Sequence, residues 1–224
     1  MDALLTNFFN IEVFRQVLPF LLEGLLTTLG LSALVIPLGL AGGLAVALFA
    51  TQSGNKAVRL LIAVYVDVFR ALPPLVLLIF IYFGFPFLGL DLPKLMAVAL
   101  GFLLNNAAYY GEIFRAGLLS IPAGQMEAAR STGLTRRQAL IHVVIPQAVR
   151  NVLPDLLGNS IEVVKLTTIA SVVALPELLR IARDAQSLVY NPSPIVLAAL
   201  IYLALLWPLV RLLSRLEHKT AAGS

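Results

Sequence analysis

The stretch Glu127–Gly133, with the sequence E-A-A-R-S-T-G, and the proline that follows it at position 146 decide how this chain is interpreted. The stretch is short, polar and contains an arginine. It nevertheless lies in a chain with 59% hydrophobic residues, 12% charged residues and a mean hydropathy of +0.92. Such a composition excludes a soluble globular domain. A polar stretch of this kind in a membrane protein indicates a loop that something outside the bilayer binds.

Several long segments of the chain lack charged residues, and each is long enough to cross a bilayer. They cover residues 24–50, 71–90 and 185–210. Each is long enough because a spanning helix needs about 20 apolar residues. One such segment would also fit a buried helix of a soluble protein, but several predict a polytopic membrane protein. We expect an all-α fold, a single transmembrane domain over 1–224, with five transmembrane helices. Their predicted ranges are 18–50, 57–88, 93–119, 138–176 and 193–214.

The basic residues predict the orientation of these spans. Nine of them fall in one set of loops and four in the other, and cytoplasmic loops carry the excess of lysine and arginine. The distribution therefore places the Glu127–Gly133 loop and the C-terminus in the cytoplasm and the N-terminus outside. The larger set is Lys56, Arg59, Arg115, Arg130, Arg136, Arg137, Arg211, Arg215 and Lys219; the smaller is Arg15, Lys94, Arg180 and Arg183.

The spacing around Glu127 resembles the EAA loop of ABC importer permeases, which is Glu-Ala-Ala, three residues, glycine, nine residues and then Ile-x-Leu-Pro. Here Gly133 follows Ala129 after three residues, and the later positions end in Val144-Ile145-Pro146. Further stretches resemble signatures of the polar amino-acid permeases, the subfamily that imports histidine, glutamine, glutamate, arginine and opines. These stretches are 65–73, 109–117, 121–125, 144–148, 165–171 and 176–179. The resemblance runs from about residue 20 to 217.

This resemblance implies a type I ABC importer permease fold in the bacterial inner membrane, with a cytoplasmic coupling helix at about 122–133. Pro122 suits the first turn of that helix, and Gly133 supplies a left-handed residue at its end. The implied partners are a cytoplasmic ATPase dimer, a second permease subunit that is identical or homologous, an extracytoplasmic binding protein and an amino-acid substrate. The alternative is an ordinary solvated loop. The predicted coupling residues are Gly124, Gln125, Glu127, Ala128, Ala129, Gly133 and Pro146.

The chain has no residues suited to catalysis. It lacks the G-x-x-x-x-G-K-[ST] phosphate loop, so ATP and Mg²⁺ are expected on a separate ATPase and no cofactor on this chain. There are no cysteines, and His142 and His218 suit packed or solvated positions better than a metal site. The basic residues are scattered among apolar spans, which gives no support to nucleic-acid binding and leaves lipid as the surrounding partner.

Two polar stripes lie within predicted spans, where polar groups usually face an interior cavity. Asn105, Tyr109 and Glu112 share one helix face, and Asp155, Asn159 and Glu162 repeat that spacing. Such a lining suits an amino acid, which presents an ammonium and a carboxylate. The predicted pathway residues are Asn105, Asn106, Tyr109, Asp155, Asn159 and Glu162. Packing remains an equal alternative for the asparagines and Glu162, and Glu112–Arg115 and Glu162–Lys165 suit structural ion pairs.

These observations predict the permease subunit of an ATP-driven importer that moves a polar amino acid, or an opine-like derivative, by alternating access. An ion-coupled secondary transporter, with Asp155 and Glu162 as coupling groups, is the first alternative. A non-transporting membrane scaffold is the second. Gly39-x-x-x-Gly43 permits close helix approach, and we interpret it as packing.

Overall fold

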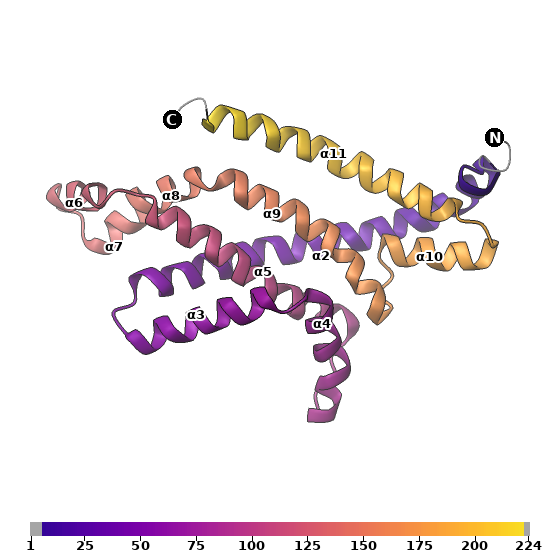
Figure 1. The fold of residues 1–224 in the computed structure, drawn as a ribbon, viewed down its shortest axis with the longest axis horizontal. Coiled ribbons are helices and arrows are strands. Elements are labelled where there is room, and N and C mark those ends of the chain that lie inside the picture. The colour runs from indigo at the N-terminus through magenta and orange to yellow at the C-terminus, as the bar shows by residue number, and fades with distance from the viewer. Residues whose placement is uncertain (1–5, 222–224) are drawn as a thin grey trace. The chain divides into compact units, whose positions relative to one another are not determined.

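The structure, a computed structural model, describes residues 6–221 with side chains as far as Arg215, and all regular elements in that range are helices (Figure 1). In chain order they are α2 (Ile11–Gln52), α3 (Lys56–Ala71), α4 (Pro74–Ile79), η1 (Phe80–Gly84), η2 (Phe85–Leu88), α5 (Lys94–Leu119), α6 (Ala123–Ser131), α7 (Arg136–Ala139), η3 (Leu140–Val144), α8 (Ile145–Asn151), α9 (Leu153–Leu166), η4 (Thr167–Val173), α10 (Leu178–Val189) and α11 (Ser193–Ala221). The predicted all-α class is confirmed. His218 lies beyond the described side chains.

The chain forms two compact units. The first contains residues up to Val35, Pro74–Gly101 and the chain from Ile161 onward; the second contains Ile36–Pro73 and Phe102–Ser160. Three of the four boundaries fall inside the continuous helices α2, α5 and α9. The fourth falls at the prolines that separate α3 from α4.

The second unit has a core in which glycines bring α2 and α5 close together. Tyr110 is fully buried there with Ala47, Phe114, Val144 and Ala148. A Cβ added at Gly43 would meet the side chain of Tyr110 and lie 2.8 Å from the backbone nitrogen of Gly111. The predicted packing role of the Gly39–Gly43 pair is confirmed, since a Cβ at Gly39 would also contact the Tyr110 ring.

The first unit has its own core, formed by the N-terminal half of α2 with α10 and α11. Leu21, Leu178 and Ala198 are buried in it. A Cβ at Gly24 would lie 3.0 Å from the Cα of Leu178, so α2 and the start of α10 can approach this closely only because residue 24 is glycine. Figure 1 shows α10 beside the first turns of α11.

The predicted ranges 18–50, 93–119 and 193–214 each correspond to one helix, α2, α5 and α11, but the predictions of single helices at 57–88 and 138–176 were wrong. The range 57–88 is interrupted where Pro73 and Pro74 end α3, so it forms two bent helical pieces that suit a broken span or a re-entrant loop. The range 138–176 contains α7, η3, α8, α9 and η4, and only Leu153–Val173 in it qualifies as a candidate span. Among the described residues, three helices qualify, or four with the broken span. α5 does not, since Asn105, Asn106, Glu112 and Arg115 lower its hydropathy.

Proline also explains the two π-helical segments. η1 ends two residues before Pro86, and η3 ends two residues before Pro146. Because proline has no N–H and crowds the carbonyl four residues earlier, a wider turn before it relieves the contact. In η3 the N–H of Ile145 accordingly donates to the carbonyl of Leu140, five residues back.

Large apolar side chains cover much of the surface of both units. Leu26, Leu60, Leu61 and Phe80 are each at least 65% exposed. Soluble proteins rarely expose contiguous apolar surface on this scale. The exposed side chains are therefore those that a lipid environment would cover, as the composition predicts.

Candidate functional site

The segment predicted to form a coupling helix at 122–133 folds as the short helix α6 (Ala123–Ser131), which begins one residue after the proline predicted for its first turn. Pro122 is its N-cap residue, with the N–H of Gln125 donating to the Pro122 carbonyl at 3.0 Å. At the other end, the hydroxyl of Thr132 donates to the carbonyl of Ala129 at 2.8 Å. Gly133 follows with a φ of +92°, a left-handed conformation that side chains disfavour. The predicted range 122–133 thus holds one helix and its two caps.

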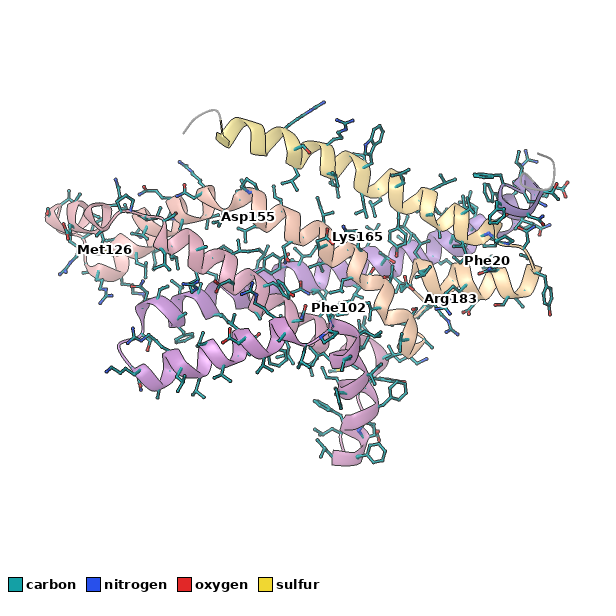
Figure 2. The ribbon with its side chains drawn as sticks, viewed as in Figure 1. Phe20, Phe102, Met126, Asp155, Lys165 and Arg183 are labelled. Atoms are coloured by element: carbon teal, nitrogen blue, oxygen red, sulfur yellow. The ribbon has the colours of Figure 1, made fainter. Side chains whose placement is uncertain are left out.

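One face of α6 packs against the core of the second unit, to which α6 belongs, and the other face is exposed. Ala129 is buried, and Met126, labelled in Figure 2, packs against the core. The Nε2 of Gln147 on α8 donates to Oε1 of Gln125 at 3.3 Å. Of the predicted coupling residues, the structure exposes Gly124, Gln125, Glu127, Ala128 and Gly133 and turns Ala129 inward.

The segment after α6 is held by a capping box and by a contact with α2. Thr135 and Gln138 cap each other at the start of α7. Arg136 donates to the side chain of Gln52, at the end of α2, at 3.2 Å. Pro146, the last predicted coupling residue, is exposed in the first turn of α8. Its position explains the π turn of η3, so the proline shapes the segment that supports α6.

Asn105 and Tyr109, predicted to line the pathway, face α3. The Nδ2 of Asn105 donates to the carbonyl of Phe69 at 2.8 Å, and the hydroxyl of Tyr109 donates to the carbonyl of Arg70 at 3.4 Å. The guanidinium of Arg70 lies over the Tyr109 ring, 5.6 Å from its centroid. Asn106 is also buried and donates to the carbonyl of Phe102 on its own helix at 2.8 Å.

Tyr110, on the adjacent face of α5, makes the contact with α9. Its hydroxyl lies 2.8 Å from the hydroxyl of Ser160. The neighbouring Asn159 side chain lies beside the Tyr110 hydroxyl, and its buried Nδ2 makes no hydrogen bond of ordinary geometry among the described residues. A poorly satisfied buried amide costs stability, which makes Asn159 a candidate for binding a ligand or water. Asn159 is one of the predicted pathway residues, whereas Tyr110 and Ser160, each adjacent in sequence to a predicted position, were not among them.

The two predicted acids on α9 are exposed. Asp155 lies in its first turn, and Lys165 near its end is labelled with it in Figure 2. Glu162 forms an ion pair with Lys165 three residues later. The Glu112–Arg115 pair is also present, with Nη2 of Arg115 2.5 Å from Oε1 of Glu112. Both predicted structural pairs are confirmed.

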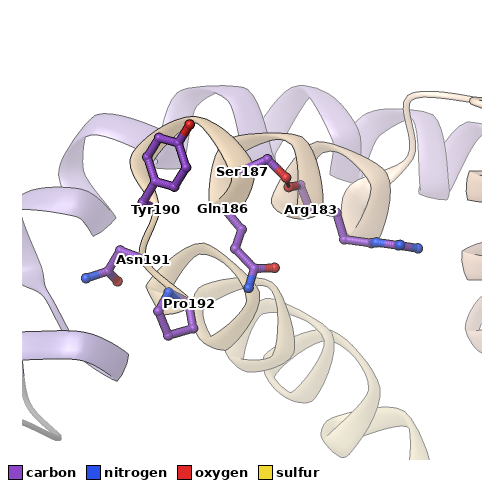
Figure 3. Close-up of a pocket in the computed structure, with 6 residues that line it drawn as sticks. All are labelled: Arg183, Gln186, Ser187, Tyr190, Asn191 and Pro192. Atoms are coloured by element: carbon purple, nitrogen blue, oxygen red, sulfur yellow. Dashed lines mark hydrogen bonds between the residues drawn. The ribbon is translucent and has the colours of Figure 1, made fainter.

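An open polar hollow lies at the end of α10. Figure 3 shows Arg183, Gln186, Ser187 and Tyr190 projecting from α10 and its C-terminus, with Asn191 and Pro192 in the turn to α11. The Asn191 side chain donates to the carbonyl of Thr6 at 3.1 Å, which ties this turn to the N-terminal segment. Tyr190 is 95% exposed. The hollow is therefore a surface feature at this end of the first unit.

Glu177 forms a buried polar cluster that the sequence analysis missed. Its carboxylate caps α10 by accepting the N–H groups of Leu179 at 2.8 Å and Arg180 at 2.6 Å. The hydroxyl of Tyr202 donates to the same carboxylate at 3.3 Å, and the N–H of Leu178 donates to the hydroxyl of Thr28 at 3.2 Å. An acidic residue followed by the amphipathic segment 178–189 was the available signal for this helix.

Glu177 should make stability depend on pH. It lies outside the candidate spans, and burial raises the pKa of its carboxyl above the usual range, against the opposing effect of the bonds to Leu179 and Arg180. The folded state then binds this proton more tightly than the unfolded state. The free energy of unfolding should fall as pH rises from the unfolded pKa through the folded pKa. Glu177→Gln should flatten that fall in thermal unfolding series, whereas the exposed control Glu12→Gln should not. Equal pH slopes for both variants would contradict the assignment.

These features define a class of protein. A helical chain with candidate membrane spans, a short exposed helix held by one face and a polar contact between α5 and α9 is a helical membrane protein. The chain belongs to the family of binding-protein-dependent transport system inner membrane components, whose model matches residues 39–221. It is the permease component of an ABC transporter and not its ATPase, so the predicted family and the predicted absence of ATP hydrolysis are confirmed.

Curated relatives and a solved structure cover nearly the whole chain. A probable glutamine ABC transporter permease of Bacillus subtilis is 37% identical, covering 91% of this chain and 94% of the relative. An arginine transport system permease of the same organism is 32% identical, covering 90% and 93%. The crystal structure of an amino acid ABC transporter with histidines matches at a TM-score of 0.82, with 36% identity and coverage of 92% and 96%. The fold is therefore that of an amino-acid ABC permease.

Proposed function

We propose that this chain is the permease subunit of an importer that moves a polar amino acid into the cytoplasm by alternating access. The observation that carries the proposal is α6, which has the predicted EAA spacing, an exposed outer face and a left-handed glycine at its end. The relatives named for glutamine and arginine support a polar amino acid as the substrate class. The two relatives are named for amino acids with different side chains, so we propose polar amino acids as the substrate class.

The proposed topology has five spans, with the N-terminus outside and the C-terminus in the cytoplasm. α5 serves as a span although its polar residues lower its hydropathy, because Asn105 and Asn106 are buried and both donate hydrogen bonds to carbonyls. Polar groups are tolerated at membrane depth when protein satisfies them. The excess of basic residues near α6 supports a cytoplasmic position for that helix.

The proposed partners follow from the exposed outer face of α6 and from the lack of a phosphate loop in this sequence. The ATPase dimer, with ATP and Mg²⁺, binds the outer face of α6 at Gly124, Gln125, Glu127 and Ala128. A second permease subunit, identical or homologous, completes the pathway, and a binding protein delivers substrate from outside. The similar crystal structure is that of an amino acid ABC transporter, which supports membership of this chain in an ABC transporter complex.

The proposed pathway contacts are the polar groups of α9. Asn159 has a buried amide nitrogen that makes no hydrogen bond of ordinary geometry among the described residues, and a substrate carboxylate would accept its hydrogen bond. Asp155 is exposed and could bind a substrate ammonium. Glu162 is occupied by Lys165 in this structure, so it would have to exchange that partner for the substrate.

Reconstitution tests the proposal. Proteoliposomes that contain the permease, its ATPase and its binding protein should accumulate a labelled polar amino acid only when ATP is present on the ATPase side. Omitting the ATPase should abolish uptake, and an ion gradient should not restore it. Uptake driven by an ion gradient without the ATPase would instead support a secondary transporter. Binding of the ATPase without uptake of any proteinogenic amino acid would support a scaffold.

A further inference from the structure

Two carbonyl groups at the end of α3 lack their ordinary backbone donors. In an α-helix the N–H of each residue donates to the carbonyl four residues earlier, so residues 73 and 74 would serve Phe69 and Arg70. Both are proline and have no N–H. Leu72, just before them, has an extended conformation with ψ of 126°, as residues before proline commonly do. The carbonyls of Phe69 and Arg70 therefore need donors from outside α3.

Side chains of α5 supply those donors in matching order. Asn105 donates to the Phe69 carbonyl at 2.8 Å, and Tyr109, one turn later on α5, donates to the Arg70 carbonyl at 3.4 Å. Asn105 is only 2% exposed, so water does not replace its bond. A third bond, from the hydroxyl of Tyr65 on α3 to the carbonyl of Leu104 at 2.7 Å, runs in the opposite direction between the same helices.

We propose that Asn105 and Tyr109 are positioning residues that cap the broken end of α3, replacing the donors that Pro73 and Pro74 remove. This assignment revises the substrate-contact role predicted for both residues. Asn106 provides the contrast. It is equally buried, but its amide donates to Phe102 on α5 itself and makes no bond to α3. The two capping hydrogen bonds lie within the second unit and do not depend on which substrate is carried.

A double-mutant cycle tests the cap by thermal unfolding of the full-length permease in detergent. Asn105→Leu should lower the unfolding midpoint by roughly 2–4 °C, because it leaves a buried carbonyl without a donor. In a Pro73→Ala background the loss should be clearly smaller, since residue 73 then has an N–H that can serve Phe69. Tyr109→Phe should show the same relation to Pro74→Ala. The control Asn106→Leu should lower the midpoint equally in both Pro73 backgrounds.

Equal losses from Asn105→Leu with and without Pro73 would overturn the proposal, as would coupling of Asn106→Leu to Pro73. An unchanged midpoint with a raised apparent KM for uptake would assign Asn105 to the substrate. If Asn105→Leu alone yields no folded protein, recovery of folded protein by Pro73→Ala supports the cap, and failure to recover it opposes the cap. The unfolding measurement uses neither ATPase nor substrate, so its result is independent of the proposed transport function.

Discussion

Replacing Gly43 with valine is expected to prevent the second unit from folding. A Cβ at this position would meet the Tyr110 side chain and lie 2.8 Å from both the carbonyl carbon of Tyr110 and the nitrogen of Gly111. These backbone atoms belong to α5 and cannot rotate away as a side chain end could. Tyr110 is itself fully buried in the core, so α2 and α5 would have to separate. Overpacking a core destabilises by about 1–3 kcal/mol, and by more where backbone must move.

Gly30 provides the matched control because it lies in the same helix with no atom within 4 Å of an added Cβ. Gly30→Val should insert and fold normally, and Gly39→Ala should have an intermediate effect since its nearest neighbour is the Tyr110 ring. Monodisperse protein recovered in detergent and the unfolding midpoint report the outcome. A Gly43→Val permease as stable as Gly30→Val would show that α2 and α5 do not approach each other as the structure has them.

The same glycine pair shows what the sequence could predict. A small residue at every fourth position permits close packing whichever neighbour is present, so the packing role of Gly39 and Gly43 was predictable. That Tyr110 is the neighbour depends on the tertiary arrangement and was not. The presence of helix α6 was predictable for a similar reason, because Pro122 and Gly133 act through their own backbone conformations.

Helical periodicity predicted which polar residues of α5 share a face, but it did not predict which neighbouring helix that face contacts. Asn105 and Tyr109 do lie one turn apart, yet they bind carbonyls of α3, while the contact with α9 comes from Tyr110 on the adjacent face. The reason lies in Pro73 and Pro74. Because these prolines have no N–H groups, two backbone carbonyls of α3 lack donors. The amide of Asn105 and the hydroxyl of Tyr109 donate to these carbonyls.

Prediction from hydrophobicity alone also failed for two segments, 138–176 and the helix α10. The segment 138–176 is apolar enough to predict one long span, but Pro146 and the break at Val152 divide it. The amphipathic helix α10 has 12 residues, too few to span a membrane, and its segment was predicted as part of a loop. Its N-cap Glu177 and the apolar residues Leu178 and Ala182, which pack into the core of the first unit, give it a structural reason to fold.

Replacing Gly133 with valine is expected to uncouple ATP hydrolysis from uptake while leaving insertion and folding intact. Gly133 has a φ of +92° and no atom within 4 Å of an added Cβ, so the substitution strains the backbone without disturbing packing. Such strain amounts to roughly 1–3 kcal/mol and is severe for a β-branched residue. It can be relieved only by changing the turn between α6 and α7. That change would reorient the exposed face carrying Glu127 and Ala128, on which the proposed ATPase contact depends.

Two variants separate this strain from a general effect of substitution. Gly133→Asn should retain most activity, since asparagine tolerates the left-handed region better than other side chains. Gly124→Ala, on α6 but with an ordinary helical φ and equally open space, should have little effect.

In proteoliposomes with the ATPase, the ratio of amino acid taken up to ATP hydrolysed should fall on the order of tenfold or more for Gly133→Val, the change that about 1.4 kcal/mol produces. A normal ratio for Gly133→Val, or an equal fall for Gly124→Ala, would mean that the conformation of this turn does not transmit the energy of ATP. The left-handed glycine is therefore the sharpest available test of whether α6 couples the permease to its ATPase, because the substitution alters backbone conformation and removes no contact.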